Sequence, residues 1–337
     1  MRLATYNVEW FANLFDDDGL LQADHGWSGR QDVRRRDQAE ALGIVFTALD
    51  ADAVMVIEAP DGSRRRSGTK ALESFAAAFG LRQRRAVMGF LSDTQQEIAL
   101  LFDPDRLSAH HDPRGGTPGE GGVPRFDESF RIDLDIDAKP ERVKWSKPPL
   151  ELAVTTQTGT TLRMIGVHAK SKAPHGAQGK EAIMRAAIEN RRKQLAQCIW
   201  LRLRVEEHLA AAEPLIVMGD FNDGPGLDEY EKLFGRSGVE VVMGEDGKEQ
   251  LHDPHAREAM TRHFSAPATA RFFLADEGRW LSALLDYIMV SPDLLDRQPA
   301  WRIWHPFDDP ACYRTPELRE ALLTASDHFP VTLDIDL

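Results

Sequence analysis

The sequence predicts a layered α/β or α+β sandwich. Apolar segments of strand length dominate the chain, and they occur in pairs separated by helical patterns, as in domains whose sheets pack against helix layers. No Gly-x-Gly-x-x-Gly run follows a strand, so a dinucleotide-binding sheet has little support. The chain has 337 residues, a length that large two-sheet folds reach as one unit. We therefore expect a single domain over residues 1–337.

The expected strands follow from hydrophobic periodicity. Ala53–Ile57 is continuously apolar, which suits a strand buried on both faces, whereas Phe130–Ile136 alternates with polar residues and should be half exposed. Leu150–Thr155 and Leu162–Val167 form a hairpin pattern around Gly159. The remaining strand patterns are Arg2–Val8, Ile98–Phe102, Pro214–Gly219, Leu285–Val290 and Val331–Ile335.

Apolar residues at helical spacing mark three further segments. They are Asp37–Leu49, the stretch that contains Leu72, Phe75 and Phe79, and Glu181–His208. Residues 103–129 fit neither pattern, because they are rich in glycine, proline and charge. A connection of that length is usually functional or disordered. We expect a loop insertion there, which could shape a substrate cleft.

Composition limits the classes of function. The net charge is −13, which argues against a general polyanion binder with a basic surface. Arginine clusters at residues 34–36, 64–66 and 82–85 could line a local groove, but solvated helix ends and loops are the simpler interpretation. Two cysteines are too few for a disulfide framework. No apolar run reaches the ~20 residues of a membrane span, and the N-terminus lacks a signal core. We expect a cytoplasmic monomer with no membrane partner.

Polar side chains stand where the apolar strands end. The stretch Leu215–Asp223 runs from a strand pattern directly into Asp220 and Asn222. Their side chains point the same way if the period-two alternation of a strand continues. The other strand ends carry the remaining candidates, which are Asn7, Glu58, His168, Asp286, Asp327 and His328. Active sites of sheet proteins gather at strand ends and in the loops beyond them.

This set of side chains indicates a kind of chemistry. It supplies several carboxylates, two histidines and two amides, with almost no thiolate. Oxygen-rich sites of this kind suit Mg²⁺ or Mn²⁺ rather than Zn²⁺. Amides and histidines can donate hydrogen bonds to phosphoryl oxygens. The combination therefore predicts metal-assisted phosphoryl chemistry.

The order of the motifs resembles that of the endonuclease/exonuclease/phosphatase superfamily, which includes pancreatic-type deoxyribonucleases and bacterial nuclease-like members. The matching segments span nearly the whole chain, and Gly-Asp-Phe-Asn and Ser-Asp-His are specific when found together. The segments are Thr5–Val8, Val56–Glu58, Gly166–His168, Gly219–Asn222, Asp286–Ile288 and Ser326–His328. The resemblance implies a four-layer sandwich of two facing, mostly antiparallel β-sheets flanked by helices, with the active site where strand ends of both sheets converge.

The resemblance also implies roles for individual residues. The metal, Mg²⁺ or Mn²⁺, would be held mainly by Glu58, with Asn7 beside it and Asp327 as a further ligand. The implied catalytic residues are His168 as donor to the phosphate, Asp220 as the group that orients or deprotonates water, Asn222 as a positioning amide, and His328 paired with Asp286. Whether His328 or Asp220 takes the proton of the attacking water stays open at this point.

Two basic residues are candidates for binding substrate. Lys170 follows the candidate histidine in a His-x-Lys-Ser-Lys run and could attract a polyanion, although a solvated loop is the alternative. Arg191 lies early in the long helix and could contact the substrate, buttress the active-site loops or form a surface ion pair. The aromatic residues Trp10, Phe11 and Phe15 could stack on bases, but we expect at least two of the three in the core.

The leading interpretation is a divalent-metal-dependent phosphodiester hydrolase, most of all a nuclease, whose partner is a phosphoester substrate such as nucleic acid. One alternative is a phosphatase that acts on a soluble phosphomonoester. Another is a non-catalytic binding protein on the same scaffold, but the presence of Glu58, Asp220 and His328 argues against it. No segment resembles the hydrophobic hairpin or amphipathic helix that a lipid-headgroup hydrolase would use.

Overall fold

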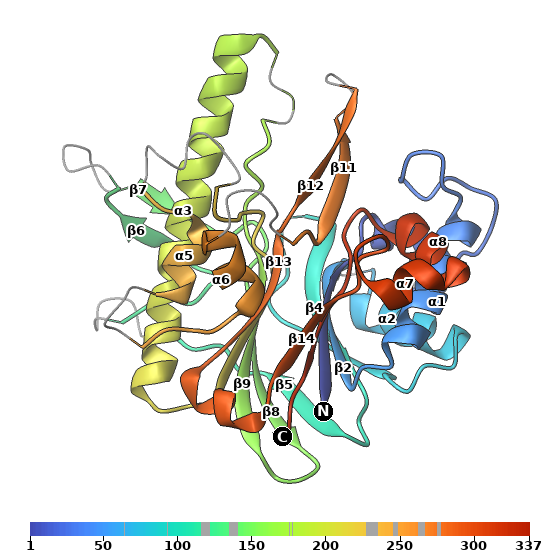
Figure 1. Ribbon diagram of the computed structural model, residues 1–337, viewed down its shortest axis with the longest axis horizontal. Coiled ribbons are helices and arrows are strands. Elements are labelled where there is room, and N and C mark those ends of the chain that lie inside the picture. The colour runs from blue at the N-terminus through green and yellow to red at the C-terminus, as the bar shows by residue number, and fades with distance from the viewer. Residues whose placement is uncertain are drawn as a thin grey trace.

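Two β-sheets pack face to face between layers of helices in the computed structural model (Figure 1). The first sheet has six strands, in the order β14 (Ala300–Ile303), β15 (Val331–Asp334), β1 (Arg2–Asn7), β2 (Ala53–Pro60), β4 (Gln96–Phe102) and β3 (Arg85–Met88). The second has five, in the order β13 (Asp286–Val290), β10 (Leu215–Asp220), β9 (Thr161–His168), β8 (Leu150–Thr156) and β5 (Leu107–His111). The structure describes residues 1–63, 65–92, 94–115, 122–134, 141–174, 176, 178–226, 235–244, 249–261, 267–274 and 278–337.

Helices cover the outer face of each sheet. Those beside the first sheet are α1 (Arg35–Leu49), α2 (Gly68–Ala78), α7 (Pro310–Arg314) and α8 (Pro316–Ala325), with the 3-10 turn η1 (Phe11–Leu14). Those beside the second are α3 (Lys180–Ala210), α5 (Gly238–Met243) and α6 (Pro254–Thr261). The other elements are the ribbons β6 (Phe130–Ile132) with β7 (Glu141–Val143) and β11 (Ala270–Leu274) with β12 (Arg279–Ala283), and the turn η2 (Pro292–Arg297).

Three apolar layers hold the sandwich together. The central layer lies between the two sheets, and its side chains alternate along the strands, so that Ile216 and Met218 face inward while Leu215 and Val217 face the helices. This alternation is the period-two pattern of a strand that is covered on both faces. Because Asp220 continues the inward series, the strand itself places a carboxylate between the sheets, at their rim.

The structure confirms the four-layer sandwich of two mostly antiparallel sheets. Each sheet contains one parallel pair, β1 with β2 and β9 with β10, and its other pairs are antiparallel. Every expected helix and strand is present, with small changes at its ends except in the strand expected at Phe130–Ile136. Whether residues 1–337 form a single domain stays a prediction. Within the described residues, no helix is long and apolar enough to cross a membrane.

The segment 103–129 is not a simple loop, so that prediction was wrong in part. It contains strand β5, which pairs with β8 and forms the edge of the second sheet. The sequence gives little sign of this strand. Only two of its five residues, Leu107 and Ala109, are apolar, and the others are a serine and two histidines. The expected strand Phe130–Ile136 is shorter in the structure, ending at Ile132. Residues 116–121 and 135–136 lie outside the described residues.

We predict that Gly219→Ala will destabilise the fold by about 2–5 kcal/mol, because it adds both backbone strain and a clash. Gly219 has a φ of 139°, and a Cβ there would lie 2.1 Å from the carbonyl oxygen of Val167. Urea denaturation would measure the change in the free energy of unfolding. Gly159→Ala is the matched control: its φ is 89°, but a Cβ would meet nothing within 4 Å, so only the strain of about 1–2 kcal/mol is expected. Equal losses in the two variants would contradict the clash.

Candidate active site

The pairing of strands brings the predicted residues together at one end of the sandwich. In the second sheet, Asp220 lies opposite His168 on the parallel neighbour and opposite Asp286 on the antiparallel one. In the first sheet, Asn7 is the last residue of β1 and pairs with Ile57 of β2. Glu58 is the residue that follows Ile57. The Ser326 hydroxyl donates to the Asn7 carbonyl oxygen at 2.8 Å, which fixes the Ser-Asp-His loop at the end of β1. Strand register therefore builds the site from both sheets.

Asp220 is the most enclosed acid of the site. Its Oδ2 accepts hydrogen bonds from Nδ2 of Asn7 and Nδ2 of Asn222, both at 3.0 Å, and its Oδ1 accepts from the Asn222 backbone N–H at 2.7 Å. Burial raises the pKa of Asp220 to about 7, although His328 opposes the rise. The carboxylate is thus held in one orientation by amides from the two sheets.

Asn222 reaches Asp220 by a route that differs from the expected one. Strand β10 ends at Asp220, and Asn222 has a φ of 49°, in the left-handed region. The two side chains therefore meet through a tight turn and not through continued strand alternation. The Asn222 amide also donates to the Ala169 carbonyl oxygen at 3.1 Å, which links the turn to the loop after β9.

His328 forms a buried pair with Asp286. Its Nδ1 lies 2.7 Å from Oδ2 of Asp286. Burial alone would lower the pKa of His328, but Asp286, together with Asp220 and Asp327, raises it well above the ordinary value. The imidazole consequently carries a proton and can act as a positively charged donor at its other nitrogen.

His168 is in the opposite electrostatic state. Burial lowers its pKa well below the usual value, and the positive charge of Lys147 adds to the effect. Its Nε2 lies 3.6 Å from Oδ2 of Asp220 and 3.9 Å from Oε1 of Glu58. A neutral imidazole has one N–H to donate and one nitrogen that accepts. The surroundings therefore favour the neutral form of His168 and the charged form of His328.

Lys147 is a site residue that sequence reasoning missed. Its Nζ lies 3.1 Å from Nδ1 and 3.2 Å from Nε2 of His168, and burial lowers its pKa although Glu58 and Asp220 oppose this. A signal was present in the predicted hairpin. Leu150 pairs with Gly166, so continuing the antiparallel register by two residues brings Pro148, the neighbour of Lys147, opposite His168.

Glu58 occupies an irregular position in β2. The register of β2 with β4 shifts between Ile57 and Ala59, and Glu58 is the extra residue, with a φ of 62°. Bulges of this kind re-aim a side chain. Its Oε2 accepts from Nε2 of Gln96 at 2.5 Å. Burial raises the pKa of Glu58, while Lys147 and His328 lower it.

The oxygen donors around Glu58 fit a divalent cation. Oδ1 of Asn7 and Oδ1 of Asp327 are both buried, and neither has a hydrogen-bond partner among the residues that the structure describes. A buried oxygen without a partner is costly, and a hard cation satisfies it because Mg²⁺ and Mn²⁺ prefer carboxylate and carbonyl oxygens. The donor set thus matches the predicted metal ligands.

A second group of side chains could also hold a metal. One ligand atom each from Asp220, Asp286 and His328 lies within 4.8 Å of the others. Nδ1 of His328 lies 2.7 Å from Oδ2 of Asp286, so two of these side chains also form a hydrogen-bonded acid–histidine pair.

The two predicted substrate-binding residues differ in position. Lys170 is half-buried in the loop after His168, and its backbone N–H donates to Oε1 of Gln197 at 2.8 Å. Arg191 is 1% exposed, and its Nη1 lies 2.6 Å from Oδ2 of Asp223. A buried, paired guanidinium does not present itself to a substrate, so its predicted substrate contact needs correction. Its position fits the alternative of a buttress beneath the loop that follows Asp220.

The ribbon formed by β11 and β12 also corrects the sequence analysis, which expected no hydrophobic hairpin. In Figure 1 it projects from the sandwich at the end opposite the two termini. The Phe272 ring contacts His328 edge-on, with 5.6 Å between ring centroids, while Phe273 and Trp280 are exposed on the other face of the ribbon. The ribbon thus adds an aromatic wall to the site.

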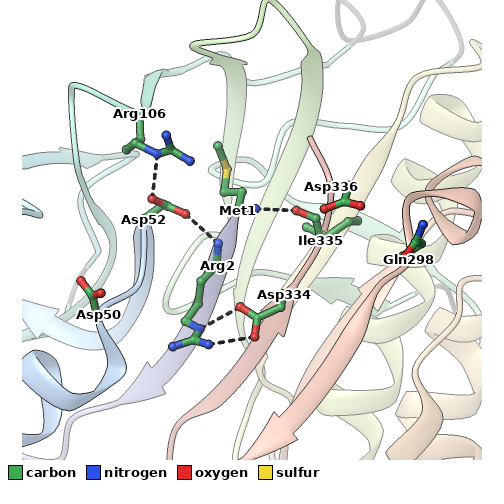
Figure 2. Close-up of a pocket in the computed structure, with 9 residues that line it drawn as sticks. All are labelled: Met1, Arg2, Asp50, Asp52, Arg106, Gln298, Asp334, Ile335 and Asp336. Atoms are coloured by element: carbon green, nitrogen blue, oxygen red, sulfur yellow. Dashed lines mark hydrogen bonds and ion pairs between the residues drawn. The ribbon is translucent and has the colours of Figure 1, made fainter.

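Another cavity, of about 400 Å³, lies far from these residues, at the end of the sheets that carries the termini. Figure 2 shows contacts among four of its charged residues: Arg2 pairs with Asp334, and the Arg2 backbone N–H donates to Asp52, which also accepts from Arg106. Arg2 begins the strand that Asn7 ends, about 17 Å away at 3.3 Å per residue. This cavity shares no residue with the predicted site.

The sandwich and the acid–histidine site at its rim define a phosphoesterase fold. The chain matches the Endonuclease/Exonuclease/phosphatase family over residues 4–328, and it belongs to that family. No curated protein matches it. Among solved structures, truncated TDP2 from Caenorhabditis elegans is 13% identical with a TM-score of 0.51, and the match covers 100% of this chain and 97% of that one. The beta toxin of Staphylococcus aureus is 12% identical with a TM-score of 0.51, and 99% of each chain is covered. At these identities the likeness shows the fold alone.

We predict that Arg191→Met will destabilise the protein by about 1.5–3 kcal/mol, because it removes the guanidinium hydrogen bond to the buried Asp223 carboxylate, while Lys172, whose Nζ lies 2.5 Å from Oδ1 of Asp223, still pairs with it. The neighbouring variant Arg192→Met is the control. Arg192 pairs with Glu141 at 2.8 Å near the surface, where such pairs contribute roughly 0–1 kcal/mol. Urea denaturation of both variants would measure the difference, and a loss for Arg191→Met no larger than that for the control would contradict the buttress.

Proposed function

We propose that the protein is a divalent-metal-dependent phosphodiester hydrolase, and that nucleic acid is its substrate. The observation that carries the proposal is the arrangement around Asp220: a carboxylate fixed by Asn7 and Asn222 faces a charged histidine, His328, while unpartnered oxygens stand beside Glu58. The arrangement supports a site in which a group that can bind water, a cationic donor and a set of metal ligands surround one small volume.

The metal would be Mg²⁺ or Mn²⁺, held by Glu58, Asn7 and Asp327. When bound, such an ion polarises a phosphoryl oxygen and neutralises charge that develops on it. The choice of ligands is supported by the unpartnered Oδ1 atoms of Asn7 and Asp327. The bulge in β2 turns the Glu58 side chain toward these two oxygens.

The reaction is an in-line attack of water on phosphorus. Asp220 accepts a hydrogen bond from the attacking water and orients it, since two amides prevent the carboxylate from rotating. The water oxygen forms a bond to phosphorus as the bond to the leaving oxygen breaks, which yields one alcohol and one phosphomonoester. His328 donates to the phosphoryl oxygen on which negative charge increases, and Asp286 holds its ring in place.

His168 and Lys147 would hold the phosphate from the other side. A neutral His168 donates one hydrogen bond without placing a second positive charge beside Lys147. The Lys147 ammonium supplies a compact cation that can pair with a phosphate oxygen. Lys170, in the loop directly after His168, would add positive potential for a neighbouring phosphate.

A screen of metal-dependent activity tests the proposal. Single-stranded DNA, duplex DNA, RNA, nucleotides and a soluble phosphomonoester would be incubated with the protein in Mg²⁺, in Mn²⁺ and in EDTA. Cleavage of diesters that requires metal is expected. Hydrolysis of the monoester alone would favour the alternative of a phosphatase, and no hydrolysis of any phosphoester would favour a binding protein.

We predict that His328→Ala and Asp220→Asn will each lower kcat by two or more orders of magnitude, because each removes a group that acts on the reacting atoms. Circular dichroism and thermal melting should show that both variants remain folded. Steady-state kinetics on the substrate found in the screen would measure the loss. A His328→Ala variant with near-wild-type diester hydrolysis would refute the assignment.

We predict that Glu58→Gln will raise the Mg²⁺ concentration that gives half-maximal activity about tenfold or more, since a neutral amide is a weaker ligand than a carboxylate. A titration of activity against Mg²⁺ would measure the shift. Glu40→Gln makes the same change at an exposed carboxylate of α1 that pairs with Arg36 at the surface, so it is the control and should leave the titration unchanged. An unchanged titration in Glu58→Gln would argue against its role as a ligand.

A further inference from the structure

A small cavity of about 180 Å³ opens directly beside Glu58. The segment that follows β1 forms one wall, and the start of β4 forms the other. Its lining residues are Trp10, Phe11, Ala12, Asn13, Glu58, Thr94, Gln95 and Gln96. Because Glu58 belongs both to this cavity and to the proposed metal site, a group that fills the cavity lies next to the reacting phosphate.

Trp10 is the lining residue whose aromatic ring is exposed at the cavity. It is 45% exposed, whereas Phe11 is fully buried and Phe15 packs against the core between the first sheet and its helices. The sequence predicts that at least two of the three lie in the core, and it does not distinguish which of them could stack on a base. The structure leaves Trp10 as the only one of the three with a large exposed ring surface.

The indole ring of Trp10 is fixed in place. Its Nε1 donates to Oε1 of Glu9 at 2.9 Å, and the other oxygen of Glu9 pairs with Arg30. Gly29 approaches so closely that a Cβ there would lie 2.9 Å from Cγ of Trp10. Packing against Gly29 and the bond to Glu9 therefore prevent the ring from turning.

The backbone of Trp10 is strained as well. Its φ of 60° lies in the left-handed region, which is a rare and strained conformation for a bulky residue. Such strain persists where the surrounding structure requires a particular side-chain direction. Here the direction it enforces places an aromatic ring in the wall of the cavity beside Glu58.

The opposite wall carries polar side chains, Thr94, Gln95 and Gln96, with which a ligand can form hydrogen bonds. Gln96 already donates to Glu58, but the amide of Gln95 is exposed and has no hydrogen bond to any described residue. An aromatic face on one side and amide and hydroxyl groups on the other are the two features that recognise a nucleobase, through stacking and through its polar edge.

We propose that this cavity is a subsite for a nucleobase attached to the scissile phosphodiester, with Trp10 as the stacking surface. The proposal rests on the proposed function, which supplies the position of the phosphate. The cavity is smaller than the 300–1,000 Å³ typical of pockets for drug-sized ligands, so it takes one ring and not an extended chain. The substrate it selects is a nucleotide diester whose base lies on the Glu58 side of the phosphate.

A quaternary ammonium group is the other ligand that an aromatic wall could attract. Such groups are bound by cages in which several aromatic faces surround the cation. Only Trp10 presents an exposed ring here, because Phe11 is buried. The polar groups of Thr94 and Gln95 would gain nothing from a methylated ammonium, whereas a base can bond to them.

The test compares a dinucleoside monophosphate, which has two bases and one diester, with two analogues that each lack one base. Trp10→Ala is expected to raise KM for the intact dinucleotide about tenfold, the effect of losing one base stack, with kcat little changed. One of the two analogues lacks the base that would fill the cavity. Trp10→Ala should not change the kinetics of that analogue. Trp10→Phe should retain most of the affinity.

Trp27→Ala is the matched control. Trp27 is 57% exposed in the same segment of the chain, but it lies on Arg34 and does not line the cavity, so its variant should match the wild type. An equal loss for the intact dinucleotide and for both analogues in Trp10→Ala would overturn the proposal, since it would reveal a structural role. Dependence on Trp10 for a phosphorylcholine ester, and not for the dinucleotide, would overturn it as well.

Calorimetry in EDTA separates this proposal from the proposed function. Binding of the intact dinucleotide to wild-type protein, weakened about tenfold in Trp10→Ala, would support the subsite even if no diester were hydrolysed. Hydrolysis of the dinucleotide with equal affinity and equal KM in wild type and Trp10→Ala would overturn the subsite while leaving the hydrolase intact.

Discussion

The buried carboxylate of Asp220 is the constraint on which the arrangement of the site depends. An ionised carboxylate that leaves water is costly unless hydrogen bonds replace its hydration. Three donors do so, and they come from both sides of the sandwich: Asn7 ends a strand of the first sheet, and Asn222 provides two N–H groups from the turn after β10. The hydrogen bond from Asn7 to Asp220 joins the two sheets. It therefore also fixes the distance between the sheets at the rim, where the other reacting groups must meet.

Three of the seven described non-glycine residues with a positive φ lie around this site. Trp10, Glu58 and Asn222 all have φ values between 49° and 62°, a region that residues with a side chain seldom adopt. In each case the unusual backbone redirects a polar or aromatic group toward the site: the Glu58 carboxylate leaves the alternation of its strand, and the Asn222 amide turns back onto Asp220. Packing of the two sheets and their helices offsets this local cost, which is how folded proteins maintain strain where chemistry needs it.

Much of the fold could be predicted from the sequence, because long strands buried on both faces leave a clear apolar pattern. The polar residues at strand ends could be found for the same reason, and Asp220, His168 and Asp286 do meet across adjacent strands. Lys147 was missed because it precedes its strand, in a segment without periodicity. Strand β5 and the ribbon β11–β12 were missed because their apolar residues are few or are exposed, so no buried face marked them. The role of Arg191 depended on its burial, which helical spacing alone did not determine.

The charge of the site decides how a substrate can be held. The arginine clusters that could have lined a groove are largely occupied by carboxylates, in the pairs Arg35–Asp24, Arg36–Glu40, Arg66–Asp17, Arg82–Asp52, Arg84–Asp105 and Arg85–Glu73. A protein that neutralises many phosphates needs unpaired cations along the backbone of its ligand. With a net charge of −13, and with Lys147, Lys170 and a metal as the cations of the proposed site, the proposed function relies on a grip on one diester. The proposed subsite adds affinity next to that phosphate, because the ring of Trp10 needs no charge to bind a base and acts where Coulomb attraction is weak.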